Sequence, residues 1–223
     1  MKRFLMASLT FLVATLPFFA SAQVKEGEKL MSLGNNNSLS IELPKIKTDF
    51  AEKIWKNFVK PYKGKYSRDK KNNEYFLDNA LIPGLGAGNT VDVHANFQQI
   101  GENTLFSVWF NLGGAFVSSA QFKEQYTEAE KLVLKYAIET AAADTKIQLE
   151  NQQDELKKQE KHLKKLEDKN ADYKKDIENW KAKIKQAETD IESNVKTQGE
   201  QKTKIGDQRK LIDEIQKKLD SLK

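Results

Sequence analysis

The most regular pattern of apolar residues in this chain is a seven-residue repeat in its C-terminal third. When Leu149 is taken as position a of a heptad, nine of the eleven a positions up to Leu219 are Leu or Ile. Position d, three residues later, is apolar or aromatic in six of eleven heptads. A period of 3.5 residues is typical of a left-handed coiled coil. The pattern therefore predicts a coiled coil over 146–223, with a length of roughly 110 Å.

The predicted seam of this coiled coil is a stripe of side chains at the a and d positions. Its members are Leu149, Leu156, Leu163, Leu166, Asn170, Tyr173, Ile177, Trp180, Ile184, Ile191, Ile205, Ile212, Ile215 and Leu219. A lone helix would leave this stripe in water, so we expect a second helix against it. That helix comes either from self-association or from an intramolecular hairpin. A hairpin would fold back near Asn170 or between Gly199 and Gly206, where each glycine weakens a helix by about 1 kcal/mol.

The orientation of the coil stays open at this stage. Asn170 occupies an a position, and an asparagine there commonly fixes the register of parallel dimers. In an in-register parallel homodimer, however, two of the flanking charge pairs attract and three repel. Each such pair contributes only a few tenths of a kcal/mol, so the charges do not select that arrangement.

The segment 23–145 has the patterns of a compact α+β domain. Alternation of apolar and polar residues predicts strands at 39–43 and 91–98, and apolar residues on one face predict a strand at 104–112. The segments 65–68 and 75–81 flank a predicted hairpin tip at DKKNN. Four-residue spacing of apolar side chains predicts a helix that begins at Thr48 and ends before Pro61. A second helix should begin at Thr127, which forms a capping-box pattern with Glu130. The expected fold is a small, mostly antiparallel sheet with two helices, followed by the long C-terminal coiled-coil helix.

The first 22 residues have the features of a cleaved secretory signal. Lys2 and Arg3 precede the apolar run 4–16, and Ala20-Ser21-Ala22 is a small-residue cleavage site. No later apolar run is long enough to cross a membrane, so we expect an exported protein, periplasmic or extracellular, without a membrane span after cleavage. The chain has no cysteine. Packing or oligomerisation, and not disulfides, must therefore stabilise it.

The charge distribution, the glycine-rich loop and the two histidines argue against several classes of function. The net charge is +5, but Lys and Glu alternate through the C-terminal half, so we expect no nucleic-acid partner. The glycines at 84–88 precede a predicted strand and not a helix, which argues against a phosphate loop. His94 and His162 lack neighbouring ligand residues at metal spacing. These patterns predict no cofactor, no metal and no enzymatic activity.

One candidate binding patch remains in the predicted domain. Trp109 lies on the outer face of its strand, and His94 and Asn96 lie on the neighbouring strand. A tryptophan in this position is either covered by the second helix or is a centre for ligand binding. We therefore treat Trp109, His94 and Asn96 as a possible polar-aromatic patch.

Three segments carry a resemblance to other sequences. SVWFNLGGAFVSS, EYFLDNA and AEKIWKNF, with the lysine-rich heptad tail, are similar to uncharacterised exported proteins of Bacteroidota-type bacteria. This resemblance covers most of the chain and implies no site residues. The general plan also resembles the Skp/OmpH periplasmic chaperones, whose helical arms interrupt the sheet domain, whereas this rod is C-terminal.

These observations predict a non-enzymatic, exported interaction or scaffold protein, with the coiled coil as oligomeriser and spacer. The first alternative is a periplasmic holdase chaperone or envelope-assembly factor that binds protein clients. A more distant alternative is a ligand-binding module that uses the outer sheet face around Trp109.

Overall fold

The computed structural model describes residues 23–222, and the predicted signal segment lies outside them. The chain divides into two compact units, with the division between Asn151 and Gln152. We call the part up to Asn151 unit 1 and the part from Gln152 unit 2. The sequence had placed this boundary six residues earlier, at 145/146.

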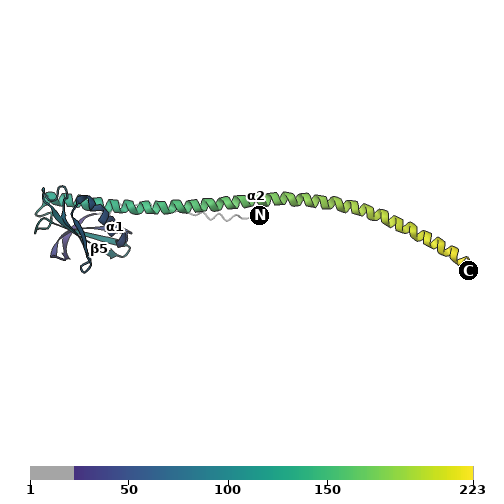
Figure 1. The fold of residues 1–223 in the computed structure, drawn as a ribbon, viewed down its shortest axis with the longest axis horizontal. Helices are drawn as coiled ribbons and strands as arrows, with labels where there is room; N and C mark the ends of the chain where they lie inside the picture. The colour runs from purple at the N-terminus through teal and green to yellow at the C-terminus, as the bar shows by residue number, and fades with distance from the viewer. Residues whose placement is uncertain (1–22, 223) are drawn as a thin grey trace. The chain divides into compact units, whose positions relative to one another are not determined.

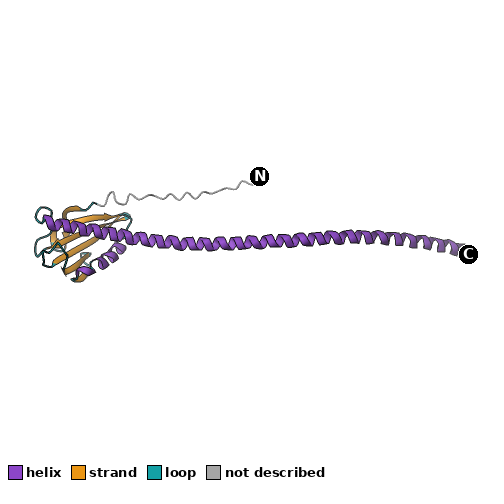
Figure 2. Cartoon of the chain, turned by 90° about the horizontal axis from the view of Figure 1, so that it is seen from above, coloured by secondary structure: helices purple, strands orange, loops and turns teal. Residues whose placement is uncertain are grey.

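Unit 1 contains a six-stranded antiparallel sheet with the strand order β1-β2-β6-β5-β4-β3 (Figure 1). Its strands are β1 (Lys25–Met31), β2 (Gly34–Leu43), β3 (Lys65–Asp69), β4 (Glu74–Ala80), β5 (Val91–Ile100) and β6 (Asn103–Asn111). In Figure 2 these strands, drawn in orange, all belong to unit 1. The antiparallel sheet and the α+β class are confirmed. Sequence analysis missed β1, because its charged residues do not alternate with apolar ones.

Two α-helices and one short 3₁₀ helix complete the described chain. They are α1 (Thr48–Phe58), η1 (Lys60–Tyr62) and α2 (Lys123–Asp220). The prediction that a helix begins at Thr127 is wrong, because α2 starts one turn earlier. Thr127 Oγ1 instead donates a hydrogen bond back to the Lys123 carbonyl oxygen at 3.0 Å, as a threonine inside a helix does.

The hydrophobic core lies between one face of the sheet and the two helices. Trp55 of α1 and Tyr136 of α2 both contact Phe106 of β6, at ring-centroid distances of 4.9 and 4.5 Å. The predicted inward face of β6 is confirmed, since Phe106, Val108 and Phe110 are all buried in this core. The helices therefore cover this face of the sheet, and only the opposite face is available for other contacts. Among the described residues, no helix is both long and apolar enough to cross a membrane.

Candidate functional site

The predicted coiled-coil seam is exposed along unit 2. From Leu156 to Leu219 the apolar and aromatic seam side chains retain between 45 and 62% of their accessible surface, and all residues from Gln152 to Ile205 are exposed. The described part of unit 2 therefore presents an apolar stripe to solvent, which is interrupted by Asn194, Gln198 and Gln201. In folded proteins, exposed apolar patches of this kind are typical of surfaces that bind another protein or a membrane.

The helix of unit 2 is unbroken where a fold-back was considered. α2 continues through Asn170 and through Gly199 and Gly206 to Asp220. Thr203 Oγ1 donates to the Gly199 carbonyl oxygen at 3.2 Å, so the helical geometry persists at this glycine. The fold-back alternative is wrong at both points. Two glycines cost about 2 kcal/mol together, less than the loss of several successive backbone hydrogen bonds at a turn.

Local ion pairs support this helix without covering its seam. Lys157 contacts Asp154 at 3.1 Å, and Lys181 contacts Glu178 at 2.8 Å. Both are neighbours on the helix surface, and such pairs contribute only a few tenths of a kcal/mol each. These pairs lie along the helix itself and leave the seam side chains exposed.

The second candidate site lies on the face of the sheet opposite the core. Strand β2 pairs with β6 only from Leu39 to Leu43, whereas its first half, Gly34–Ser38, pairs with β1 alone. Side chains and backbone near the β1–β2 turn nevertheless contact β4 and β6. The β1–β2 hairpin must therefore curve over this outer face, because a flat β1 would reach neither strand.

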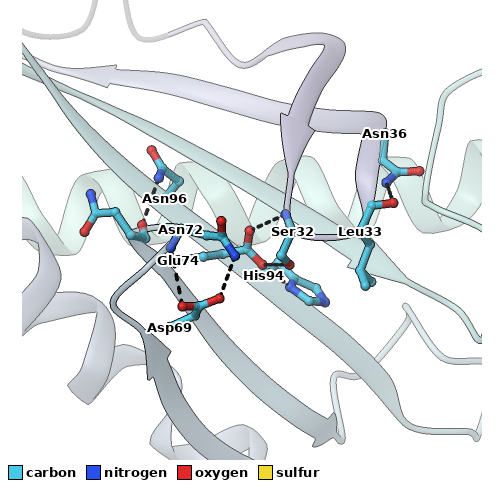
Figure 3. A network of polar contacts seen from close by, with 9 residues as sticks. Ser32, Leu33, Asn36, Asp69, Asn72, Glu74, His94 and Asn96 are labelled. Atoms are coloured by element: carbon cyan, nitrogen blue, oxygen red, sulfur yellow. Dashed lines mark hydrogen bonds and ion pairs between the residues drawn. The ribbon is translucent and has the colours of Figure 1, made fainter.

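Glu74 fastens the turn of this hairpin to the sheet (Figure 3). Its carboxylate accepts a hydrogen bond from the Ser32 backbone N–H at 2.9 Å and another from the Ser32 hydroxyl at 2.7 Å. Glu74 Oε1, which accepts the bond from the Ser32 hydroxyl, also contacts His94 Nδ1. Glu74 and His94 are both buried. Because the carboxylate lies between Ser32 and His94, the imidazole is not placed to take a proton from the serine, as a catalytic triad requires.

Lys29 of β1 attaches the same hairpin to β6. Its ammonium donates to Ser107 Oγ at 2.7 Å, and Ser107 Oγ also lies 3.1 Å from Ser40 Oγ. Partial burial lowers the pKa of Lys29, because the charged form loses hydration. Ser107 is buried, so a substrate could reach its hydroxyl only if the hairpin moved away.

The predicted patch of Trp109, His94 and Asn96 is not an open surface. Trp109 is 2% exposed, and its indole N–H donates to the Asn36 carbonyl oxygen at 3.2 Å. His94 is 6% exposed, and half-buried Asn96 donates to the Asn73 carbonyl oxygen at 2.8 Å. The cover over Trp109 is the β1–β2 hairpin and not the second helix. Sequence analysis missed this because β1 gave no strand signal.

The other residues singled out from sequence have structural surroundings. The glycine-rich loop joins β4 to β5, and a Cβ on Gly86 would lie 2.0 Å from the Asn89 carbonyl oxygen, so a tight turn requires glycine there. His162 is exposed beside the seam. Within residues 23–222, no three His, Cys, Asp or Glu side chains are grouped to hold a metal ion. Comparison of the chain with protein-family models, curated proteins and solved structures finds no match.

Proposed function

We propose that this chain is a non-enzymatic, exported interaction protein that self-associates through the seam of unit 2. The observation that carries the proposal is the exposed stripe from Leu156 to Leu219, which keeps one heptad phase throughout. Burial of apolar surface stabilises association by about 25 cal/mol per Å². A stripe of this length thus offers a large driving force to a second helix.

Unit 1 serves in this proposal as a docking module carried by the coiled coil. Its core is closed by α1 and α2, and its outer face is closed by the β1–β2 hairpin held by Lys29 and Glu74. A closed body of this kind suits recognition by its surface and loops better than capture of a small molecule in a deep cavity. Export follows from the signal-like segment 1–22, which precedes the described residues.

The test is the mass of residues 23–223 in solution. Multi-angle light scattering should give an oligomer for the parent chain and a monomer, or a much weaker oligomer, for Ile184→Gln/Ile191→Gln. The matched control is Lys185→Gln/Glu192→Gln, which changes the next residue in the same two heptads and should leave the mass unchanged. A parent chain that is monomeric at micromolar concentration refutes self-association.

The holdase alternative rests on the same exposed stripe, which is flanked by many lysines. A client-binding stripe would suppress the aggregation of an unfolded protein, and added salt would weaken this suppression because charges are screened. The seam variant Ile184→Gln/Ile191→Gln should then lose suppression. A monomeric parent chain that suppresses aggregation would favour this alternative over the scaffold.

A further inference from the structure

The charges beside the seam distinguish the two ways in which a second copy can lie against it. This inference rests on the proposed self-association and concerns its geometry. Positions e and g flank the seam, and their partners differ between parallel and antiparallel coils. The side chains at these positions in unit 2 are exposed, so they are available to a partner helix.

A parallel, in-register dimer is poorly matched at these positions. Each g residue would face the e residue five places later in the partner. Two pairs attract: Asp176–Lys181 and Lys183–Glu188. Within the described residues, three pairs repel: Glu155–Glu160, Lys169–Lys174 and Lys204–Arg209. Like charges that face each other across a coiled coil oppose that pairing.

An antiparallel dimer with complete overlap is well matched. Here a residues face d residues, g faces g and e faces e, and Leu149 lies opposite Leu222 of the partner. Five pairs attract: Glu155–Lys218, Glu160–Arg209, Glu167–Lys202, Lys181–Glu188 and Lys183–Asp190. One pair, Lys169–Lys204, repels. Each pair occurs twice in either symmetric dimer, so the pairs can be compared directly, and the antiparallel arrangement has more attractive and fewer repulsive ones.

The same charges also select the register. If the helices slide by one heptad in one direction, Lys181 and Lys183 each face their own copies in the partner. In the other direction, Glu188 and Asp190 face their own copies. Two repulsive self-contacts at the centre thus oppose either shift, and such contacts discriminate between registers even when each is weak.

The seam is compatible with this arrangement. Asn170 lies opposite Gln201 of the partner, so two polar amides share a layer in which they can hydrogen-bond. Near the centre, Ile184 faces Ala187 and Trp180 faces Ile191, which sets a large side chain against a smaller one. Complementary sizes of this kind fill a helix interface without voids.

We propose that the seam of α2 binds the seam of a second copy of this chain in antiparallel orientation, with Leu149 opposite Leu222. The centre of the dimer then lies between Lys185 and Gln186. Two observations support this orientation and register. The charges at the e and g positions are complementary, and both neighbouring registers bring like charges together. The occupant of the exposed seam is therefore a second copy, aligned in the opposite direction.

Disulfide cross-linking tests orientation and register together, because the native chain contains no cysteine. Two variants of residues 23–223 are used, Leu156→Cys and Ile215→Cys, whose side chains face each other in the proposed dimer. Under mild oxidation, each variant alone should stay uncross-linked, and an unfolded and reassembled mixture should give a disulfide-linked dimer. Light scattering on the same samples under reducing conditions reports whether they are dimers.

The outcomes separate the inference from the proposed function. Cross-links within each single variant would establish a parallel coil and overturn the antiparallel assignment. A dimeric mass without any cross-link, in the mixture or alone, would overturn the register while self-association stands. A monomeric mass for the parent chain and both variants would overturn self-association itself.

Discussion

Tyr136 of α2 donates its hydroxyl hydrogen bond to the Ala51 carbonyl oxygen of α1, at 2.8 Å, inside the core of unit 1. Both residues are fully buried, and the Tyr136 ring also packs against Phe58 and Phe106. One side chain therefore joins the two helices to each other and to the sheet. Tyr66, in contrast, has a buried hydroxyl oxygen without a hydrogen-bond partner among the described residues.

The two tyrosines should respond differently to loss of their hydroxyl groups. Tyr136→Phe removes a made hydrogen bond and should lower the free energy of unfolding by about 1 kcal/mol. Tyr66→Phe removes an unpaired buried hydroxyl and should leave the free energy unchanged or raise it by up to about 1 kcal/mol. Urea unfolding followed by near-UV circular dichroism measures both. If both variants lost the same free energy of unfolding, this prediction would be contradicted.

Unit 1 should lose stability at alkaline pH. Burial raises the pKa of Tyr136 well above the ordinary value of 10.0, and also raises the pKa values of Tyr66 and Tyr75. In the unfolded chain these phenols titrate near 10, so the unfolded state releases its protons first. The stabilisation is complete below pH 10 and declines as pH rises above it. Urea midpoints at pH 8, 10 and 11 measure the decline, and Tyr136→Phe should reduce it.

Glu74 should control the closure of the β1–β2 hairpin. Glu74→Gln replaces a charged acceptor of two Ser32 hydrogen bonds and should cost about 2 kcal/mol of local stability. Hydrogen exchange should then accelerate in β1 and in the first half of β2, while the amides of α1 keep their protection. Ser32→Ala is the matched comparison, because it removes the hydroxyl bond and keeps the backbone one. Uniform acceleration across unit 1 would assign Glu74 a global role instead.

A charge exchange should report on the antiparallel dimer independently of cysteine chemistry. Lys183→Glu places one acidic group against Asp190 of the partner at each of the two symmetric contacts and should weaken dimerisation by on the order of 1 kcal/mol. Adding Asp190→Lys should restore it, because the pair is then reversed. In a parallel dimer Asp190 would face Val195 and could give no rescue. Sedimentation equilibrium at low salt measures the dissociation constants, with Lys185→Glu as the control.

The sequence was most informative where one periodicity persisted. The strand 91–98 was predicted because apolar and polar residues alternate, and the strand 104–112 because Phe106, Val108 and Phe110 recur on one face. β5 contains all of the first range, and β6 contains all of the second except Leu112. The long C-terminal helix was predicted because the heptad phase holds from Leu149 to Leu219. The helix start at Thr127 was wrong because the capping-box pattern also occurs inside a helix, where threonine bonds to the preceding turn.

The outer face of the sheet could not be predicted in the same way. Its cover depends on β1, a strand of mainly charged residues whose pairing becomes evident only from contacts that are distant in sequence. Ser32 with Glu74 and Lys29 with Ser107 are separated by 42 and 78 residues. No local pattern carries such information, so the sequence suggested only the second helix as a cover for Trp109 and left a binding patch as the alternative.

The two open edges of the sheet, β1 and β3, are both rich in charge. Lys25, Glu26, Glu28 and Lys29 lie on β1, and Lys65, Arg68 and Asp69 lie on β3. A foreign strand that added to either edge would have to desolvate or oppose these groups, which natural sheets use against edge-to-edge aggregation. Charged edges of this kind would oppose edge-to-edge pairing of the sheets at the high local concentration that the proposed self-association would create.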